Sequence, residues 1–214
     1  MRVLSVNVGL PRDVMWRGKS ISTGIYKEPV PGRVPLRKLN FAGDRQADLR
    51  VHGGLDKAVY VYPSEFYELW SHELPELAFG PGVFGENLTT EGLVDDEVSI
   101  GDRFLIGTAE LVVTQPRLPC FKLGIKMERD EFVAEFLERG LFGFYLAVAR
   151  EGEVEAGDPI VALSRDPHQF GVNEIARLYA RDRHDVKRMR RAAELDVLPE
   201  GWRDYFRRRV ASLA

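Results

Sequence analysis

Cys120 is the only cysteine among the 214 residues, and two cations, Arg117 and Lys122, lie within three positions of it. A positive environment favours the thiolate, which is the form of cysteine that attacks electrophiles and binds soft metals. Arg117 adds a planar set of donors suited to phosphate or carboxylate, and Pro116 and Pro119 restrict the backbone around it. Free cysteines also occur as small apolar core residues. The segment therefore predicts a chemically active thiol beside an anion site, with a packed thiol as the alternative.

A second candidate site is the sequence His52-Gly53-Gly54, which is followed by Lys57. Two adjacent glycines remove two side chains, so backbone N–H groups can approach an anion closely. Lys57 adds positive charge, and His52 adds a donor or a ligand. The pattern predicts a cradle for phosphate or another oxyanion. The alternative is a Gly-Gly turn between strands with a lysine on the surface.

The third candidate is the glycine-rich segment 80–92, which contains Asn87 and Thr89. Its four glycines are more than a plain hairpin needs. The amide of Asn87 and the hydroxyl of Thr89 can hydrogen-bond a polar ligand, and binding residues are frequent on loops. A purely structural loop is the alternative.

Three other kinds of site are excluded by their motifs. Gly18-Lys19-Ser20 resembles the end of a P-loop, but Asp13 stands where that motif requires glycine. The His-Gly-Gly string resembles a hydrolase oxyanion loop, yet the chain has no Gly-x-Ser-x-Gly nucleophile motif. The 4 histidines are scattered, and one cysteine is too few for a zinc knuckle.

The composition is that of a globular protein, because 44% of the residues are hydrophobic and 29% are charged. The length suits one large domain, or one domain with a small appendage. No stretch approaches the ~20 apolar residues that span a bilayer, and the first residues lack a signal-peptide pattern. A single cysteine excludes an internal disulfide, so a reducing cytoplasm is the expected location. The net charge of −3 gives no general attraction to nucleic acid.

Short strand-like runs separated by glycine and proline dominate the first 165 residues. The strands expected there are Arg2–Gly9, Val34–Leu39, Ala58–Tyr62, Glu97–Ile100, Arg103–Ile106, Glu110–Thr114, Phe144–Ala149 and Ile160–Ser164. Helices are expected over 64–72 and 130–139, with Gly140 ending the second. Closely spaced strands favour a sandwich or barrel over alternating βαβ units. We therefore expect a mainly β, α+β domain over residues 1–165.

A change of composition after Asp166-Pro167 marks a second module over residues 166–214, with three short helices. They are expected over Val172–Ala180, Asp185–Leu195 and Gly201–Val210. From Gly171 onward, 11 Lys and Arg stand against 7 Asp and Glu, a net charge of +4, whereas the first 170 residues carry −7. The basic helices are either a solvated surface or a docking face for an acidic partner protein. No nucleic-acid-binding motif is present.

Taken in order, these strings resemble the signature of MOSC domains, which are named for the C-terminal domain of molybdenum cofactor sulfurase. The resemblance covers about residues 1–165. Residues 43–48 and the three-helix tail resemble the stand-alone, YiiM-like branch, which is associated with resistance to N-hydroxylated base analogues. The matching strings are His52-Gly53-Gly54 with Lys57, Phe84-Gly85-Glu86-Asn87-Leu88, Gly101-Asp102, and the run from Gln115 to Leu123.

The resemblance implies a β-barrel with peripheral helices that binds a molybdopterin-type cofactor and works without pyridoxal phosphate. Cys120 would be the molybdenum ligand and the catalytic residue. The cofactor-binding residues would be His52, Gly53, Gly54, Lys57, Asn87, Thr89, Arg117 and Lys122. Molybdenum prefers sulfur donors, and the pterin carries an anionic phosphate, so these residue types suit the group. The segment 10–32, with Trp16, Lys19 and Thr23, is expected to be an extended loop that borders the substrate entrance.

The implied reaction is the two-electron reduction of small N-hydroxylated compounds, such as hydroxylaminopurine-type base analogues, as part of detoxification. The chain has no flavin or nicotinamide motif, so a separate reductase would supply electrons and could dock on the basic C-terminal helices. Binding to nucleic acid or membrane is not expected, and a homodimer is left open. The alternatives are a non-redox carrier of molybdopterin or of a persulfide on Cys120, and a barrel that has lost its ligand.

Overall fold

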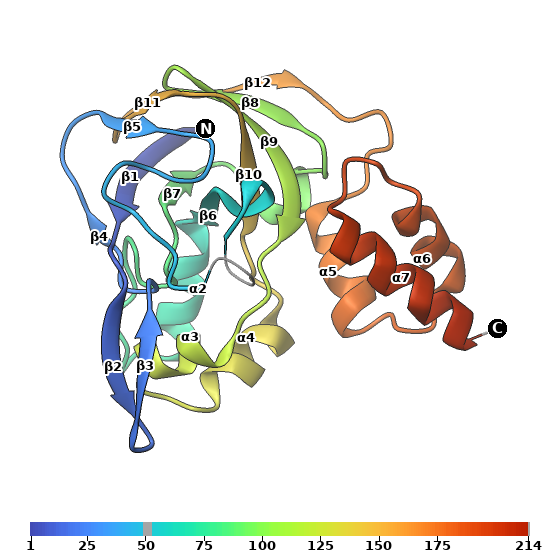
Figure 1. Cartoon of the computed structure of the whole chain (residues 1–214), viewed down its shortest axis with the longest axis horizontal. Coiled ribbons are helices and arrows are strands. Elements are labelled where there is room, and N and C mark those ends of the chain that lie inside the picture. Colours follow the sequence, from blue (N-terminus) through green and yellow to red (C-terminus); the bar gives the residue numbers. More distant parts are fainter. Residues whose placement is uncertain (49–52, 214) are drawn as a thin grey trace.

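The structure is a computed structural model of the chain, and it describes residues 1–48 and 53–213. Figure 1 shows a curved sheet with helices beneath it, and a separate group of three helices beside the sheet. The predicted mainly β, α+β fold with a C-terminal three-helix module is thereby confirmed. His52 lies outside the described residues.

An eight-stranded sheet forms the body of the protein. All neighbouring strands are antiparallel except β6 and β7, which are parallel. In spatial order the strands are β12 (Ile160–Ser164), β8 (Arg103–Ile106), β9 (Ala109–Pro116), β10 (Phe144–Arg150), β6 (Val59–Pro63), β7 (Leu88–Glu91), β1 (Arg2–Val8) and β4 (Glu28–Pro29). Most of these strands lie where the β-branched and aromatic runs predict them.

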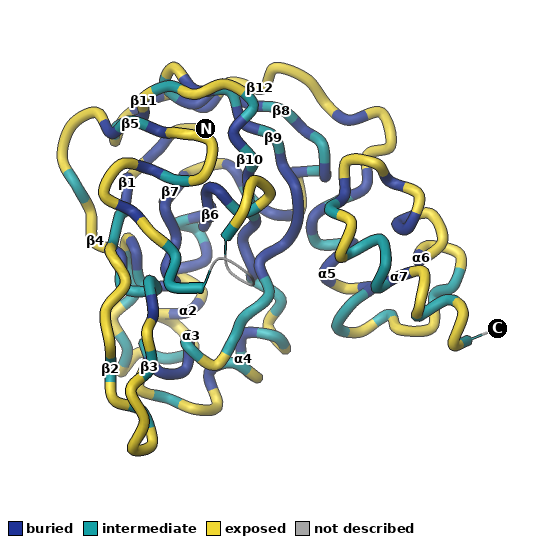
Figure 2. The backbone as a smooth tube through the Cα atoms, viewed as in Figure 1, coloured by how far each residue is buried: buried dark blue, intermediate teal, exposed yellow. Residues whose placement is uncertain are grey.

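The sheet curls until its far strands approach each other. Arg2, at the start of β1, forms an antiparallel bridge with Pro159, just before β12. Val3 N–H donates to the Asp158 carbonyl at 2.9 Å, and Ile160 N–H donates to the Met1 carbonyl at 3.1 Å. The inward-facing residues of the strands are buried (Figure 2) and form one apolar core.

Two small pairs of strands lie outside the main sheet. Strands β5 (Val34–Leu36) and β11 (Gly152–Val154) pair with each other. Strands β2 (Arg12–Trp16) and β3 (Lys19–Thr23) form a hairpin that projects from the body (Figure 1). The prediction of an extended loop over 10–32 is therefore wrong. Its turn residues, Arg17 and Gly18, both have positive φ, which is the geometry of a two-residue hairpin turn.

One further expectation is wrong, and some short elements were not predicted. The predicted strand Glu97–Ile100 is a 3₁₀ turn, η2 (Asp95–Glu97), followed by a single bridge from Ser99 to Gly171. The short helix α3 (Phe121–Lys126), directly after Cys120, was not expected. A second 3₁₀ turn, η1 (Leu55–Lys57), precedes β6.

Helices α2 (Glu65–Glu73) and α4 (Phe132–Arg139) cover an aromatic cluster below the sheet. Trp70 and Phe136 stack with their ring centres 5.9 Å apart, and Tyr62 and Phe84 stack at 4.2 Å. As predicted, Gly140 ends α4 with a left-handed φ of 78°, and its N–H donates to the Phe136 carbonyl. This rigid base supports the loops around Cys120.

The C-terminal module consists of α5 (Val172–Ala180), α6 (Val186–Ala193) and α7 (Glu200–Leu213). Its apolar residues belong to the same core as the sheet. Ile100 N–H donates to the Phe170 carbonyl, and Val172 N–H donates to the Val98 carbonyl, each at 2.9 Å. The division at residues 165 and 166 falls between β12 and α5 and stays a prediction. Across the described residues, no helix combines the length and apolar character needed to cross a membrane.

Candidate functional site

The segment that carries Cys120 leaves the sheet at the end of β9 and enters α3. Arg117 N–H donates to the Gly143 carbonyl at 3.1 Å. This bond extends the pairing of β9 with β10 by one step beyond the end of β9. Cys120 follows in extended backbone, and its thiol is free and half-buried. The strand therefore fixes Arg117, while Cys120 sits at a partly open position.

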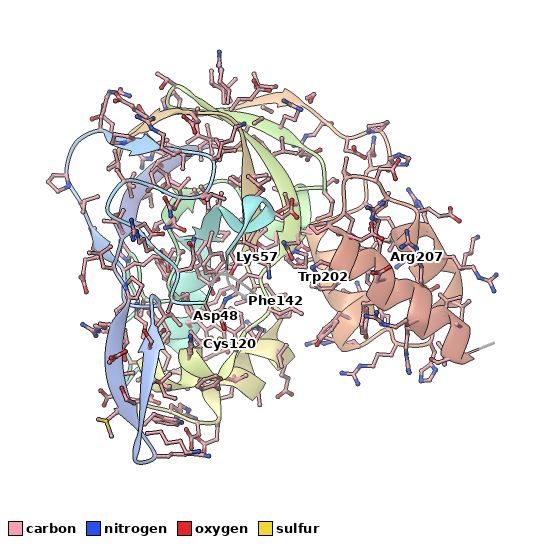
Figure 3. All side chains as sticks on the ribbon, viewed as in Figure 1. Asp48, Lys57, Cys120, Phe142, Trp202 and Arg207 are labelled. Atoms are coloured by element: carbon pink, nitrogen blue, oxygen red, sulfur yellow. The ribbon has the colours of Figure 1, made fainter. Side chains whose placement is uncertain are left out.

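Two cavities meet at Cys120. The smaller has a volume of about 90 Å³ and is bordered by segment 23–27, the loop at Gly85 and segment 117–122. The larger has a volume of about 630 Å³ and lies between the sheet and the three-helix module. The residues that line both are Lys57, Leu118, Cys120 and Tyr145. Figure 3 shows Lys57 and Cys120 between the β2–β3 hairpin and the three-helix module.

Four cationic side chains line the smaller cavity, namely Lys27, Lys57, Arg117 and Lys122. Lys27 forms a buried ion pair with Asp44, and burial lowers the pKa of Lys27 despite that pair. Burial also lowers the pKa of Lys57, while the charge of Asp56 acts in the opposite direction. The cavity is therefore a positive environment in which an anion would be stabilised.

Arg117 is buried, but its side chain is not fully hydrogen-bonded. It is 5% exposed, and its Nη1 has no hydrogen-bond partner within the described chain. The guanidinium carbon lies 5.4 Å from the ring centre of Tyr60 and 5.2 Å from that of Phe136. Leaving a buried N–H group unpaired costs on the order of 1–3 kcal/mol. An anion in the cavity would remove that cost.

Tyr60 and Tyr145 line the smaller cavity from the sheet, and Tyr145 also lines the larger one. They stand opposite each other in the pairing of β6 with β10, and their ring centres are 5.3 Å apart. Burial raises the pKa of Tyr145, while the Arg117 guanidinium acts to lower it and a charge on Cys120 would raise it further. The two rings are therefore neutral apolar surfaces with hydroxyl groups at their tips.

The glycine-rich loop is held in place by the buried carboxyl of Glu86. Glu86 accepts hydrogen bonds from the N–H groups of Gly82 and Phe84, at 2.7 and 2.9 Å, and from the Tyr67 hydroxyl. Burial raises the pKa of Glu86, and these hydrogen bonds oppose the shift. The loop is thus rigid where it borders the smaller cavity.

Asn87 lines the smaller cavity, but its amide hydrogens are already used. They are donated to the Asn7 carbonyl at 3.3 Å and to Asp44 Oδ2 at 2.9 Å, and Oδ1 accepts from Tyr60 N–H at 3.1 Å. One lone pair of Oδ1 is left for a ligand. In the structure, Asn87 mainly joins the loop to the strands on either side.

The structure brings most of the sequence-predicted residues together. Lys57, Asn87, Arg117, Cys120 and Lys122 line the smaller cavity. Gly53 and Gly54 line the larger one.

Thr89 lies behind the cavity walls. Its hydroxyl is 3.3 Å from Glu86 Oε1 and 3.2 Å from the Tyr67 hydroxyl, and it lines neither cavity. Of the segment 10–32, Thr23 reaches the smaller cavity, whereas Trp16 and Lys19 line neither.

Sequence reasoning missed the aromatic lining of both cavities. Tyr60 and Tyr145 were hidden because nothing local shows that β6 pairs with β10. Tyr179, Trp202 and Tyr205 were hidden because they come from helices far along the chain. The one available signal was that five aromatic residues, these three with Phe170 and Phe206, recur within a module otherwise rich in charge.

The donor set at Cys120 fits a molybdenum cofactor. Cys120 offers one sulfur ligand, and the cofactor's dithiolene would provide further sulfur donors, which molybdenum prefers. The unpaired Nη1 of Arg117, with Lys57 and Lys122, fits the anionic phosphate. Within residues 1–48 and 53–213, no three His, Cys, Asp or Glu side chains are grouped to hold a metal ion.

Comparison with known domain families gives two matches. The family described as "MOSC domain" matches residues 48–161, which include the cationic residues of the smaller cavity except Lys27. The family described as "YiiM-like, 3-alpha helix domain" matches residues 172–213, which cover helices α5 to α7.

Individual proteins agree with these matches. YflK of Bacillus subtilis (strain 168) is 41% identical over 204 residues, covering 95% of this chain and 92% of that protein. A protein of Gibberella moniliformis named "Reductase" is 32% identical over 164 residues, covering 75% of this chain but 29% of that protein. The crystal structure of YiiM from Geobacillus stearothermophilus superimposes with a TM-score of 0.83 and 32% identity, covering 100% of this chain and 99% of that one. The chain belongs to the MOSC domain family, in its YiiM-like branch.

Proposed function

We propose that the protein is a molybdenum cofactor-dependent reductase of small N-hydroxylated compounds. The observation that carries the proposal is the pairing, in one cationic cavity, of a free thiol with a buried arginine whose Nη1 has no hydrogen-bond partner in the described chain. The family relationship and the relative named "Reductase" support an enzymatic role. That relative is much longer than this chain, so the assignment of activity to this chain is our proposal.

Seven residues of the cavity have a definite task in this scheme. The Cys120 thiolate would bind the metal, and Arg117, Lys57 and Lys122 would hold the phosphate of the cofactor. Tyr60, Tyr145 and Leu118 form a surface that keeps bulk water from one side of the site. When bound, the cofactor supplies two-electron oxygen-atom transfer.

The overall reaction is R–NHOH + 2e⁻ + 2H⁺ → R–NH₂ + H₂O, in which the N–O bond breaks and the oxygen leaves as water. The electrons would come from a separate reductase protein. We place the reaction in the cytoplasm, because a reducing compartment keeps the single thiol free. Detoxification of hydroxylaminopurine-type base analogues is the physiological use that we propose.

The test compares wild-type protein with Cys120→Ser and Cys120→Ala, each purified from a host that makes the cofactor and from one that does not. Wild-type protein from the first host should contain about one molybdenum per chain and reduce N-hydroxylated compounds once a reductase or a chemical reductant is added. Both variants should lose activity, with molybdenum lost or bound in an altered environment by X-ray absorption. Full activity of Cys120→Ser would contradict the proposal.

Intact-mass measurement separates the proposal from carriage of sulfur. A persulfide on Cys120, together with no reduction of any N-hydroxylated compound by cofactor-loaded protein, would favour a carrier. The absence of a persulfide in protein that turns over would favour the enzyme.

A further inference from the structure

One wall of the larger cavity is formed by residues of the three-helix module. Three half-buried rings from α5 and α7 line it, those of Tyr179, Trp202 and Tyr205. The ring centre of Tyr179 lies 5.6 Å from that of Trp202 and 5.1 Å from that of Tyr205. The three rings are therefore in contact and form one aromatic cluster, in which Tyr179 meets Trp202 edge-on and Tyr205 at a tilt. Cys120 lines the same cavity, so this surface and the thiol face a common space.

Hydrogen bonds fix the aromatic wall relative to the cationic site. Trp202 Nε1 donates to Gln115 Oε1 at 2.7 Å, and Gln115 Nε2 donates to the Asp56 carbonyl at 3.2 Å. Gln115 lies two residues before Arg117 on β9, and Asp56 directly precedes Lys57. Figure 3 shows Trp202 on the side of the helix module that faces the sheet. The aromatic wall is therefore joined by hydrogen bonds to the two segments that carry Arg117 and Lys57.

The chemistry of this wall suits a flat ring with polar edges. Aromatic side chains bind planar heterocycles by stacking, and Tyr and Trp combine an apolar face with a polar group. In the described part of the chain, neither the Tyr179 nor the Tyr205 hydroxyl has a hydrogen-bond partner, so both are free to meet ring heteroatoms. A small aliphatic molecule would gain little from such a surface.

We infer that the three-helix module forms the recognition site for a planar heteroaromatic substrate, and that the sheet region supplies the reactive site. The reaction in this inference rests on the proposed function. The binding site is inferred independently, from the larger cavity and the aromatic rings that line it. The module thereby acts as a specificity element.

Calorimetric titration with adenine tests the binding site separately from catalysis, because adenine has the flat ring but no N–O bond. The full-length, cofactor-loaded protein is compared with Trp202→Leu and Tyr205→Leu, which keep apolar volume and remove the ring. Each variant should bind adenine about 5- to 150-fold more weakly, the range expected for one lost stacking partner. Trp16→Leu is the matched control, because Trp16 lies on the hairpin and lines neither cavity. It should bind as wild type does.

A fourth variant, Trp202→Phe, keeps a ring but cannot donate to Gln115. Its adenine affinity should fall between those of wild type and Trp202→Leu. Unchanged adenine binding in both leucine variants would overturn the inference, as would an equal loss in Trp16→Leu.

Kinetics with two substrates provide the second arm. Trp202→Leu should reduce kcat/KM for 6-hydroxylaminopurine about tenfold more than for N-methylhydroxylamine, within the range for one stacking contact. Equal losses for both compounds would show that the module supports the fold only. If adenine binding depends on Trp202 but wild-type protein reduces neither compound, the recognition site stands and the reductase proposal fails. If both compounds are reduced but adenine does not bind, the reductase proposal stands and the recognition site fails.

Discussion

Arg117 and Asp95 are both buried, and each has one polar atom without a partner in the described chain. Arg117 lines a cavity whose other walls carry lysines, and an anion can enter there. Asp95 lies in η2, away from that cavity, and accepts a hydrogen bond from Gly143 N–H at 2.8 Å. A buried carboxyl without a cation adjusts by keeping its proton, whereas a guanidinium cannot give one up. The two residues therefore predict a binding site and a pH effect, respectively.

Replacing Arg117 by Met should weaken retention of the cofactor by about 10- to 150-fold, the worth of one hydrogen bond to a charged group. Molybdenum content after extended dialysis measures the loss. Without cofactor, the variant should be at least as stable as wild type in urea, because a buried unpaired N–H has been removed. Arg117→Lys keeps the charge and should retain more cofactor than Arg117→Met. Equal retention in wild type and Arg117→Met would exclude Arg117 from the anion site.

Asp95 should make the stability of the fold fall as the pH rises. Burial raises the pKa of Asp95 from 3.8 to about 7. Between these values the folded protein binds more protons than the unfolded chain, so the free energy of unfolding decreases with rising pH, by up to about 4 kcal/mol. Urea unfolding of Asp95→Asn at pH 5 and pH 8 should lack this slope. Asp13→Asn, at an exposed hairpin position, should keep it.

The sequence was sufficient to predict site residues that lie close together along the chain. Arg117, Cys120 and Lys122 lie within six positions, so their proximity in space needed no knowledge of the fold. Tyr145 and Trp202 reach the same space only through strand pairing and helix packing, which local patterns do not specify. Thr89 shows the converse. Its position two residues after Asn87 suggested a shared site, but its hydroxyl contacts Glu86 Oε1 and the Tyr67 hydroxyl behind the cavity wall.

Predictions of helices and strands were correct where flanking residues define both ends of the element. They were wrong where the backbone turns within a run of polar residues. Strand β8 and helix α5 lie at the predicted residues. The β2–β3 hairpin carries few apolar residues, so its alternation was weak and only the Arg17-Gly18 turn marked it. The apolar residues Val98 and Ile100 suggested a strand. In the structure they are buried in a turn region, and their backbone groups hydrogen-bond to residues at the start of the C-terminal module.

Gly85 provides an element-scale test, because the glycine-rich loop is pressed against the segment after β3. Its φ is 81°, and an added Cβ would lie 2.7 Å from Ile25 Cγ1. Gly85→Ala should lower the free energy of unfolding by about 1–2 kcal/mol from backbone strain alone, and more if Ile25 cannot move. Gly80→Ala is the matched control in the same loop, because an added Cβ there has no atom within 4 Å. Similar stabilities of the two variants would show that the loop relaxes freely.

For the whole molecule, the helix module presents two different surfaces. Helices α5 and α7 line the larger cavity, while α6 does not. Several arginines of the module are paired within it, such as Arg203 and Arg207 with Glu200. On α6, Lys187 and Arg190 are exposed and have no ion pair or hydrogen bond in the described chain. Because they are three positions apart, they share one face of the helix. We therefore take α6 as the docking face that is proposed for an acidic reductase.

Lys187→Glu, alone and combined with Arg190→Glu, should raise the KM for the reductase partner by about tenfold at low salt, because like charges oppose docking. The difference should shrink as salt is raised towards 1 M, where screening acts within about 3 Å. Turnover with a chemical reductant should stay at the wild-type level, since α6 lines neither cavity. Lys19→Glu makes the same charge change on the hairpin and should leave the KM unchanged. An equal rise in KM for Lys19→Glu would mean that net charge, rather than the α6 surface, governs the encounter.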